Sequence, residues 1–122
     1  MLVYRVATAE RMPYGVPGGP YNGPETDEWQ KDMAWAHSNR DHPNPYDDGG
    51  LHGILDDEFC AFASMELLTS WFKDWLDKLH EAGYLKHVYD VPDEHVRFGE
   101  KQVVAKLKLG ALVRTEPILV AA

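Results

Sequence analysis

The sequence predicts an α+β fold in a single domain spanning residues 1–122, with a split, mostly antiparallel sheet and two helices. Three observations support this fold class. The chain has 122 residues, which suits one domain with a modest core. An apolar run at residues 59–63, typical of a buried strand, changes at Ser64 into a helical repeat of apolar residues. Short apolar segments then follow this helix, as in a sheet built from hairpins.

The longer helix is expected at about residues 64–82, with its apolar residues on one face. Ser64 suits the N-cap because its hydroxyl can accept a hydrogen bond from a main-chain amide of the first turn. Gly83 is expected to end the helix because glycine readily adopts the left-handed conformation. The apolar face is formed by residues three or four positions apart: Met65, Leu68, Phe72, Leu76 and Leu79.

Two further elements and two loops are expected before this helix. Residues 1–6 alternate in the manner of a strand, and residues 26–38 form a shorter helix. Residues 13–24 are mostly glycine and proline, so they form either a flap over a bound molecule or a surface connection. Residues 39–58 form a long polar loop, and loops of this length tend to be functional or disordered.

After Gly83 the pattern changes to short extended segments. Strands are expected at residues 84–91, 96–98, 102–109 and 111–115. In the third of these segments, alternate residues are apolar along most of its length. The apolar tail at residues 118–122 must then pack against the domain or form an interface.

The excess of acidic residues limits the kinds of partner that the protein can bind. The chain has 12 basic and 20 acidic residues, which gives a formal net charge of −8. This charge disfavours direct binding to nucleic acid, because phosphates would be repelled. Two interpretations remain. The charge serves solubility, or it attracts the protein to a basic surface of a host protein or nucleoprotein complex.

Several features predict a cytoplasmic location in the host cell. No apolar run is long enough to cross a bilayer, so no membrane partner is expected. The first residues do not have the charged start and long apolar segment of a secretion signal. Cys60 is the only cysteine, so an internal disulfide is impossible. Cys60 is expected to be a buried structural residue rather than a nucleophile.

The long polar loop invites comparison with metal sites. Residues 39–58 include two histidines and five aspartates. Their spacing does not match HExxH, zinc-ligand or EF-hand motifs. No metal site is therefore predicted, and turn formation explains most of these residues.

Arg5 is an isolated charge in an otherwise apolar strand, and two interpretations are open. An edge strand can carry an arginine whose head group reaches water. Alternatively, the planar guanidinium points into a cleft and binds a phosphate or carboxylate.

Short motifs resemble two groups of known proteins. VYR (residues 3–5), FAS (residues 62–64) and EKQ (residues 100–102) resemble the three motifs that surround the nicotinamide cleft of the ADP-ribosyltransferase superfamily. Nearly the whole chain is similar to small proteins of unknown function from phage and prophage genomes. That similarity is carried by GPY (19–21), HPNPYDDG (42–49), FASMELLTSWF (62–72) and GEKQVV (99–104). Together the resemblances imply a phage protein with a compact ADP-ribosyltransferase-like fold.

The first resemblance implies NAD as a cofactor and a catalytic role for four residues. Arg5 would hold the phosphates or ribose of NAD, and Ser64 would support the nicotinamide side. The superfamily has a carboxylate that stabilises an oxocarbenium-like transition state. Gln102 matches that position best but carries no charge, so Glu100 would replace it only through a shifted strand register. The cofactor-binding candidates are Tyr4, Arg5 and Tyr21.

Two functions are therefore predicted. In the first, a small acidic phage accessory protein binds and inhibits a host macromolecule, for example a nucleic-acid-handling defence complex, as anti-CRISPR proteins do. In the second, an ADP-ribosyltransferase-like enzyme uses NAD to modify a host target. The partner-binding candidates of the first hypothesis are Trp35, Tyr46, Asp47, Asp48, Asp56 and Asp57.

Overall fold

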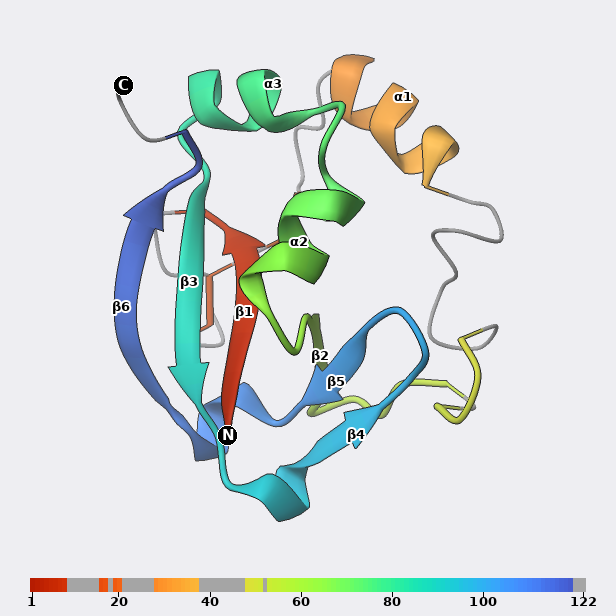
Figure 1. The fold of residues 1–122 in the computed structure, drawn as a ribbon, viewed down its shortest axis with the longest axis vertical. Helices are drawn as coiled ribbons and strands as arrows, with labels where there is room; N and C mark the ends of the chain where they lie inside the picture. Colours follow the sequence, from red (N-terminus) through yellow and green to blue (C-terminus); the bar gives the residue numbers. More distant parts are fainter. Residues whose placement is uncertain (9–15, 18, 21–27, 38–47, 52, 120–122) are drawn as a thin grey trace.

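The computed structural model of the chain describes residues 1–8, 16–17, 19–20, 28–37, 48–51 and 53–119. These residues form two three-stranded antiparallel sheets and three α-helices (Figure 1). The predicted α+β fold class is confirmed. Three predicted site residues, Tyr21, Tyr46 and Asp47, lie outside the described residues, as do most of the loop predicted at residues 13–24 and half of the loop predicted at residues 39–58.

The first sheet contains β1 (Leu2–Ala7), β3 (Leu85–Asp90) and β6 (Ala111–Pro117), in the order β1-β3-β6. Both strand pairs are antiparallel, and Arg5 of β1 lies opposite His87 of β3. β3 is the central strand, so its middle residues are buried. β6 is an outer strand, and most of its side chains are exposed.

The second sheet contains β2 (Phe59–Ala61), β5 (Val103–Ala105) and β4 (Val96–Phe98), in the order β2-β5-β4. Two main-chain hydrogen bonds between Tyr4 and Phe62, of 2.8 and 2.7 Å, join this sheet to β1. The residue that follows β2 therefore ties the two sheets together.

Two 3₁₀ turns flank the hairpin of β4 and β5: η1 (Asp93–His95) precedes β4, and η2 (Leu107–Leu109) follows β5. The strand predicted at residues 102–109 is therefore too long. All three residues of β5 are buried, so side chains on both of its faces are covered and the alternation does not hold. In η2, Leu107 is buried and Leu109 is exposed.

The three helices are α1 (Glu28–Ala36), α2 (Met65–Trp71) and α3 (Leu76–Glu81). Ser64 is the N-cap of α2, as predicted, and its hydroxyl accepts a hydrogen bond of 3.2 Å from the Leu67 amide. Gly83, with a φ angle of 87°, follows α3 in the predicted left-handed conformation. The single helix predicted at about residues 64–82 is instead two helices, divided by a turn at residues 72–75.

This turn redirects the chain so that both helices cover the core. The Trp75 amide donates to the Phe72 carbonyl at 2.8 Å, which closes the turn. A straight helix over residues 65–81 would be about 25 Å long, whereas the six residues of β1 span about 20 Å. Figure 1 shows α2 beside β1 and α3 across the ends of β3 and β6. The division thus keeps Leu68 and Leu79 buried in one cluster.

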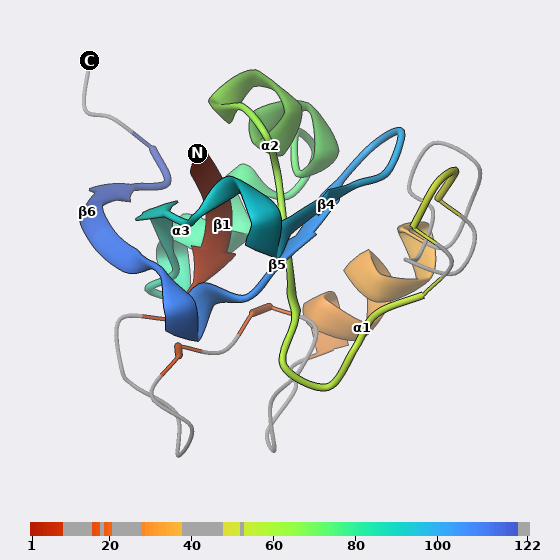
Figure 2. The ribbon, with the colours of Figure 1, turned by 90° about the horizontal axis from the view of Figure 1, so that it is seen from below.

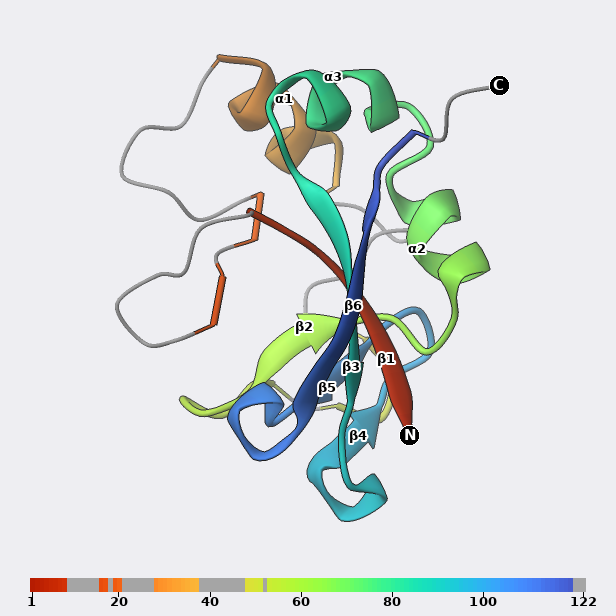
Figure 3. The same ribbon diagram turned by 90° about the vertical axis from the view of Figure 1, so that its left-hand side faces the viewer.

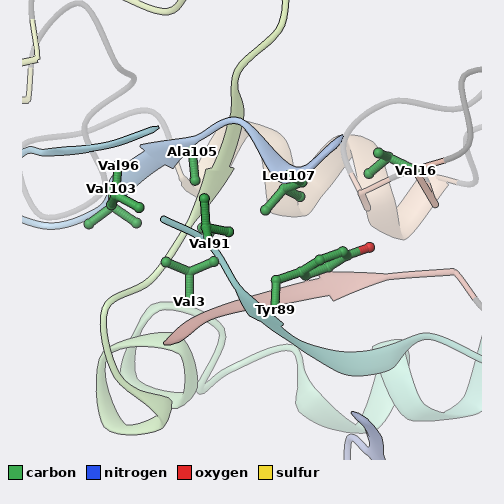
Figure 4. Packing of buried hydrophobic residues seen from close by; sticks show 9 residues of the cluster. Val3, Val16, Tyr89, Val91, Val96, Val103, Ala105 and Leu107 are labelled. Atoms are coloured by element: carbon green, nitrogen blue, oxygen red, sulfur yellow. The ribbon is translucent and has the colours of Figure 1, made fainter. Parts of the chain in front are cut away.

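The core consists of two clusters. In the first, Val3, Tyr89 and Val91 face Leu107 and residues of the second sheet (Figure 4). The second lies beneath the helices and includes Met33, Phe62, Leu68, Phe72, Leu79 and Ile118. Because Ile118 is buried there, at least the start of the apolar tail packs against the domain.

Replacing Gly110 with alanine is expected to destabilise the fold. Gly110 precedes β6, and a Cβ atom there would approach the main-chain oxygen of Asp90 to 2.5 Å. Backbone of the central strand β3 would have to shift, so we expect the free energy of unfolding to fall by about 1–3 kcal/mol. Urea denaturation measures the change. Gly49→Ala is the matched control, because its Cβ would meet only the Glu100 side chain, at 3.8 Å. Equal stability of the two variants would contradict this argument.

Candidate functional site

Arg5 is held by main-chain carbonyl groups inside the fold. Its Nη1 donates to the Cys60 carbonyl at 2.9 Å and its Nη2 to the Pro17 carbonyl at 3.3 Å. The guanidinium lies 5.4 Å from the centre of the Phe59 ring. Burial lowers the pKa of Arg5. Arg5 therefore ties β1 to β2, and both terminal nitrogens have protein partners.

Ser64 and Tyr4 also have structural roles. The Ser64 hydroxyl caps α2, as described above. The Tyr4 main chain pairs with Phe62, and its side chain packs against the second core cluster. Neighbouring strand residues point to opposite faces, so the side chains of Tyr4 and Arg5 lie on different faces of the first sheet.

Asp48 organises the turn between β4 and β5. Its carboxylate accepts hydrogen bonds from three successive main-chain amides, of Glu100 at 2.5 Å, Lys101 at 3.1 Å and Gln102 at 2.9 Å. Only 2% of Asp48 is exposed, so this cradle of amides satisfies a buried charge. Asp48 is therefore not on the surface, where a partner-binding residue was expected.

The three motifs of the resemblance come from elements that meet near the junction of the two sheets. Arg5 contacts β2, Ser64 begins α2, and Gln102 precedes β5, whose first residue pairs with Ala61 of β2. The Glu100 side chain is exposed, whereas Gln102 is buried. The polar contacts seen for Arg5, Ser64 and the amide of Gln102 all hold the main chain in place.

Arg97, whose side chain is 38% exposed, forms an ion pair with the buried Glu58, and the sequence analysis missed this pair. Arg97 donates from Nε and Nη2 to the two carboxylate oxygens of Glu58, at 2.8 and 2.6 Å. It also donates to the carbonyls of Leu51 and Gly53. The hydrogen bonds from Arg97 to the Glu58 carboxylate hold the pKa of Glu58 below its ordinary value. The only sign of this pair in the sequence was that a charged residue, Glu58, directly precedes an apolar strand.

The remaining partner-binding candidates lie on the surface but not together. Trp35 on α1 is 84% exposed. Asp56 and Asp57 are also exposed, in the segment that precedes β2. Trp35 and the two aspartates therefore belong to different elements, and Figure 1 draws α1 apart from the strands of the second sheet.

His87 is a buried titratable residue outside the predicted set. Its side chain lies opposite Arg5 and Thr115 on the neighbouring strands, and its ring stacks on Tyr89 with 6.3 Å between centroids. Neither ring nitrogen has a hydrogen-bond partner within the described part of the chain. Burial lowers the pKa of His87. The main chain of Thr8 and Ala7 lies near the ring and raises the pKa in part, although its geometry falls short of a hydrogen bond, and the charge of Arg5 lowers it further.

Acid is expected to destabilise the protein through His87. The unfolded chain takes up a proton near the ordinary His pKa of 6.5, whereas the folded pKa is lower. The unfolded state therefore binds more protons as the pH falls below about 6.5, and the free energy of unfolding decreases. Denaturation at a series of pH values measures this slope.

The His87→Leu variant should flatten the slope, because leucine has a similar volume and does not titrate. Val88→Ala is the control: Val88 is buried on the same strand and does not titrate, so its loss should lower stability but leave the slope unchanged. A wild-type slope in the His87→Leu variant would show that another group is responsible.

In the described residues, no three His, Cys, Asp or Glu side chains are grouped so that they could hold a metal ion. None of the helices seen in the structure has the length and apolar character that a bilayer span requires.

Comparison with known protein families gives one match, to the family described as Bacteriophage T4 Y00F protein, over residues 1–119. The chain belongs to this family. It is therefore a phage protein. No curated protein and no solved structure matches the chain.

Five exposed carboxylates of this Y00F family member lie in segments that contact one another, and we call this set the acidic band. The Met1 amino group contacts Asp90 at 3.2 Å and Asp93 at 3.1 Å. η1 is joined to the end of β5 by a hydrogen bond from the Lys106 amide to the His95 carbonyl, and Lys106 contacts Asp57 at 3.4 Å. Figure 2 views the molecule from the side on which η1 lies. The band consists of exposed residues: Asp56, Asp57, Asp90, Asp93 and Glu94.

Proposed function

We propose that this phage protein is an accessory protein that binds a basic surface of a host macromolecule and thereby inhibits it. A host defence complex that handles nucleic acid, of the kind that anti-CRISPR proteins inhibit, is the target class we favour. Such a complex has a basic groove for phosphates, and an acidic protein can occupy it. This activity takes place in the host cytoplasm.

The acidic band is the observation that carries this proposal. The carboxylates of the band are exposed, whereas those of Asp48 and Glu58 are buried and bind groups inside the fold. Two cations lie within the band, Lys106 and the Met1 amino group. The net charge of −8 makes the electrostatic potential around the whole protein negative, as it is at the band. Two exposed apolar residues, Leu55 and Phe98, lie in the adjoining segments and add area that a partner can cover.

Neutralising three carboxylates of the acidic band is expected to weaken capture of the target. The variant carries Asp56→Asn, Asp57→Asn and Glu94→Gln, and all three residues are exposed. Removing three favourable charges should weaken binding about tenfold or more. The measurement is affinity capture from a lysate of the phage host, followed by an assay of whether the wild-type protein blocks nucleic-acid binding by the captured complex.

The control variant removes three exposed charges elsewhere, with Asp74→Asn, Asp77→Asn and Glu81→Gln around α3. It should capture the complex as the wild type does. Raising the salt concentration from about 0.1 to 1 M shortens the screening length from about 10 to 3 Å and should release the complex. Equal losses in both variants, or capture that ignores salt, would exclude the acidic band as the contact surface.

NAD-dependent ADP-ribosyl transfer is the alternative that the motif resemblance implies, and it has less support. The terminal nitrogens of Arg5 donate to carbonyls, and Tyr4 packs on the other face of the sheet. Gln102 carries no charge to stabilise a developing cation. The carboxylate nearest in sequence, Glu100, is exposed at the turn that Asp48 holds.

Millimolar NAD is therefore expected to leave the melting temperature unchanged, because a ligand raises it only by binding the folded state. A thermal-shift titration tests this. A rise that disappears in both Arg5→Ala and Glu100→Gln would favour the enzyme over the inhibitor. Glu100→Gln is included because Glu100 is exposed, so its replacement should not affect folding.

A further inference from the structure

Strand β6 is the open edge of the first sheet. Its hydrogen-bonded neighbour in the sheet is β3, and no described strand lies on its other side. Figure 3 shows β6 in front of the sheet. The opposite edge differs, because β1 is bridged to the second sheet through Phe62. An edge with unpaired main-chain groups is a template for another strand.

The side chains of β6 are more apolar than an exposed edge strand needs. Leu112 is 44% exposed and Val113 is 51% exposed. Leu109, in the turn before the strand, is 55% exposed. A partner strand on β6 would cover part of this apolar area, and removing it from water favours binding.

The regular part of β6 is short and is centred on Thr115. The register with β3 shifts between Val88 and Tyr89, which leaves Val113 as the extra residue of a β-bulge. Pro117 ends the strand and has no amide hydrogen to donate. Regular pairing along the open edge is therefore limited to the residues between these two positions, Arg114, Thr115 and Glu116.

This regular stretch is complementary to itself. Arg114 and Glu116 lie on the same face of β6 and form an ion pair of 3.0 Å. If two copies pair antiparallel about Thr115, each Arg114 lies opposite Glu116 of the second copy, and the two threonines lie opposite each other. Opposite charges and threonine pairs are both favourable directly across strands. A register centred on Arg114 would instead place two like charges face to face.

We propose that β6 binds β6 of a second copy of this chain, in an antiparallel arrangement with a two-fold axis at Thr115. The two three-stranded sheets then form one six-stranded sheet, and the interface is the same patch on both copies. The contact is small, so the dimer is weak and its population depends on concentration. This inference does not depend on the proposed function.

Charge reversal tests the proposed register. The single variants Arg114→Glu and Glu116→Arg each place like charges opposite one another, so each should dimerise about tenfold more weakly than the wild type. The double variant Arg114→Glu, Glu116→Arg restores opposite charges and should regain wild-type dimerisation. A mixture of the two single variants should form a heterodimer. Sedimentation over a range of concentrations measures all four, and circular dichroism verifies that each variant is folded.

Cross-linking tests the axis directly. In a Cys60→Ser background, Thr115→Cys should form a disulfide-linked dimer on mild oxidation, because the two positions face each other. Leu112→Cys is the control and should remain monomeric, since it is three residues from the axis. A wild-type protein that stays monomeric up to millimolar concentration would overturn the proposal. Cross-linking through position 112 rather than 115 would overturn the register.

Discussion

Two buried carboxylates hold the end of the long polar loop onto the β4–β5 hairpin, and much of the structure depends on them. Asp48 binds the amides of the hairpin turn, and Glu58 pairs with Arg97 on β4. An ionised carboxylate is costly to bury without partners, so each of these side chains fixes the main chain that supplies its donors. β2 begins directly after Glu58 and is thereby brought beside β5. β2 in turn supplies the Cys60 carbonyl that binds Arg5.

This arrangement decides which charged residues are available for function. Arg5 and Asp48 looked functional in the sequence because isolated charges in apolar strands and acidic loops often are. In the structure both bind main-chain groups and connect elements that are distant in the chain. The charges left on the surface are mostly acidic and are not part of the core. A fold does not by itself specify an activity, so the functional argument rests on those surface residues.

The parts of the fold that local chemistry determines could be predicted from the sequence. Ser64 and Gly83 mark the start and end of the helical region because capping depends on a few neighbouring residues. The turn at residues 72–75 contains neither glycine nor proline, so no local signal in the sequence marks it. The Arg97–Glu58 pair joins residues 39 positions apart, and its spacing matches no motif. The candidate site could not be predicted for the same reason. Its residues were chosen by motif, and a motif does not show which side chains contact one another in the folded chain.

The acidic band and the β6 edge are neighbouring but separate surfaces. Asp90 of the band pairs with Ala111 at the start of β6, whereas the proposed two-fold axis lies at Thr115 near the other end of that strand. In an antiparallel dimer the two Ala111 ends point in opposite directions, so the two acidic bands lie at opposite ends of the joined sheet. Neither band is covered by the dimer contact. If both proposals hold, two basic grooves, or two sites on one extended complex, would be bound at once, and such bivalent binding would increase the overall affinity without a new contact.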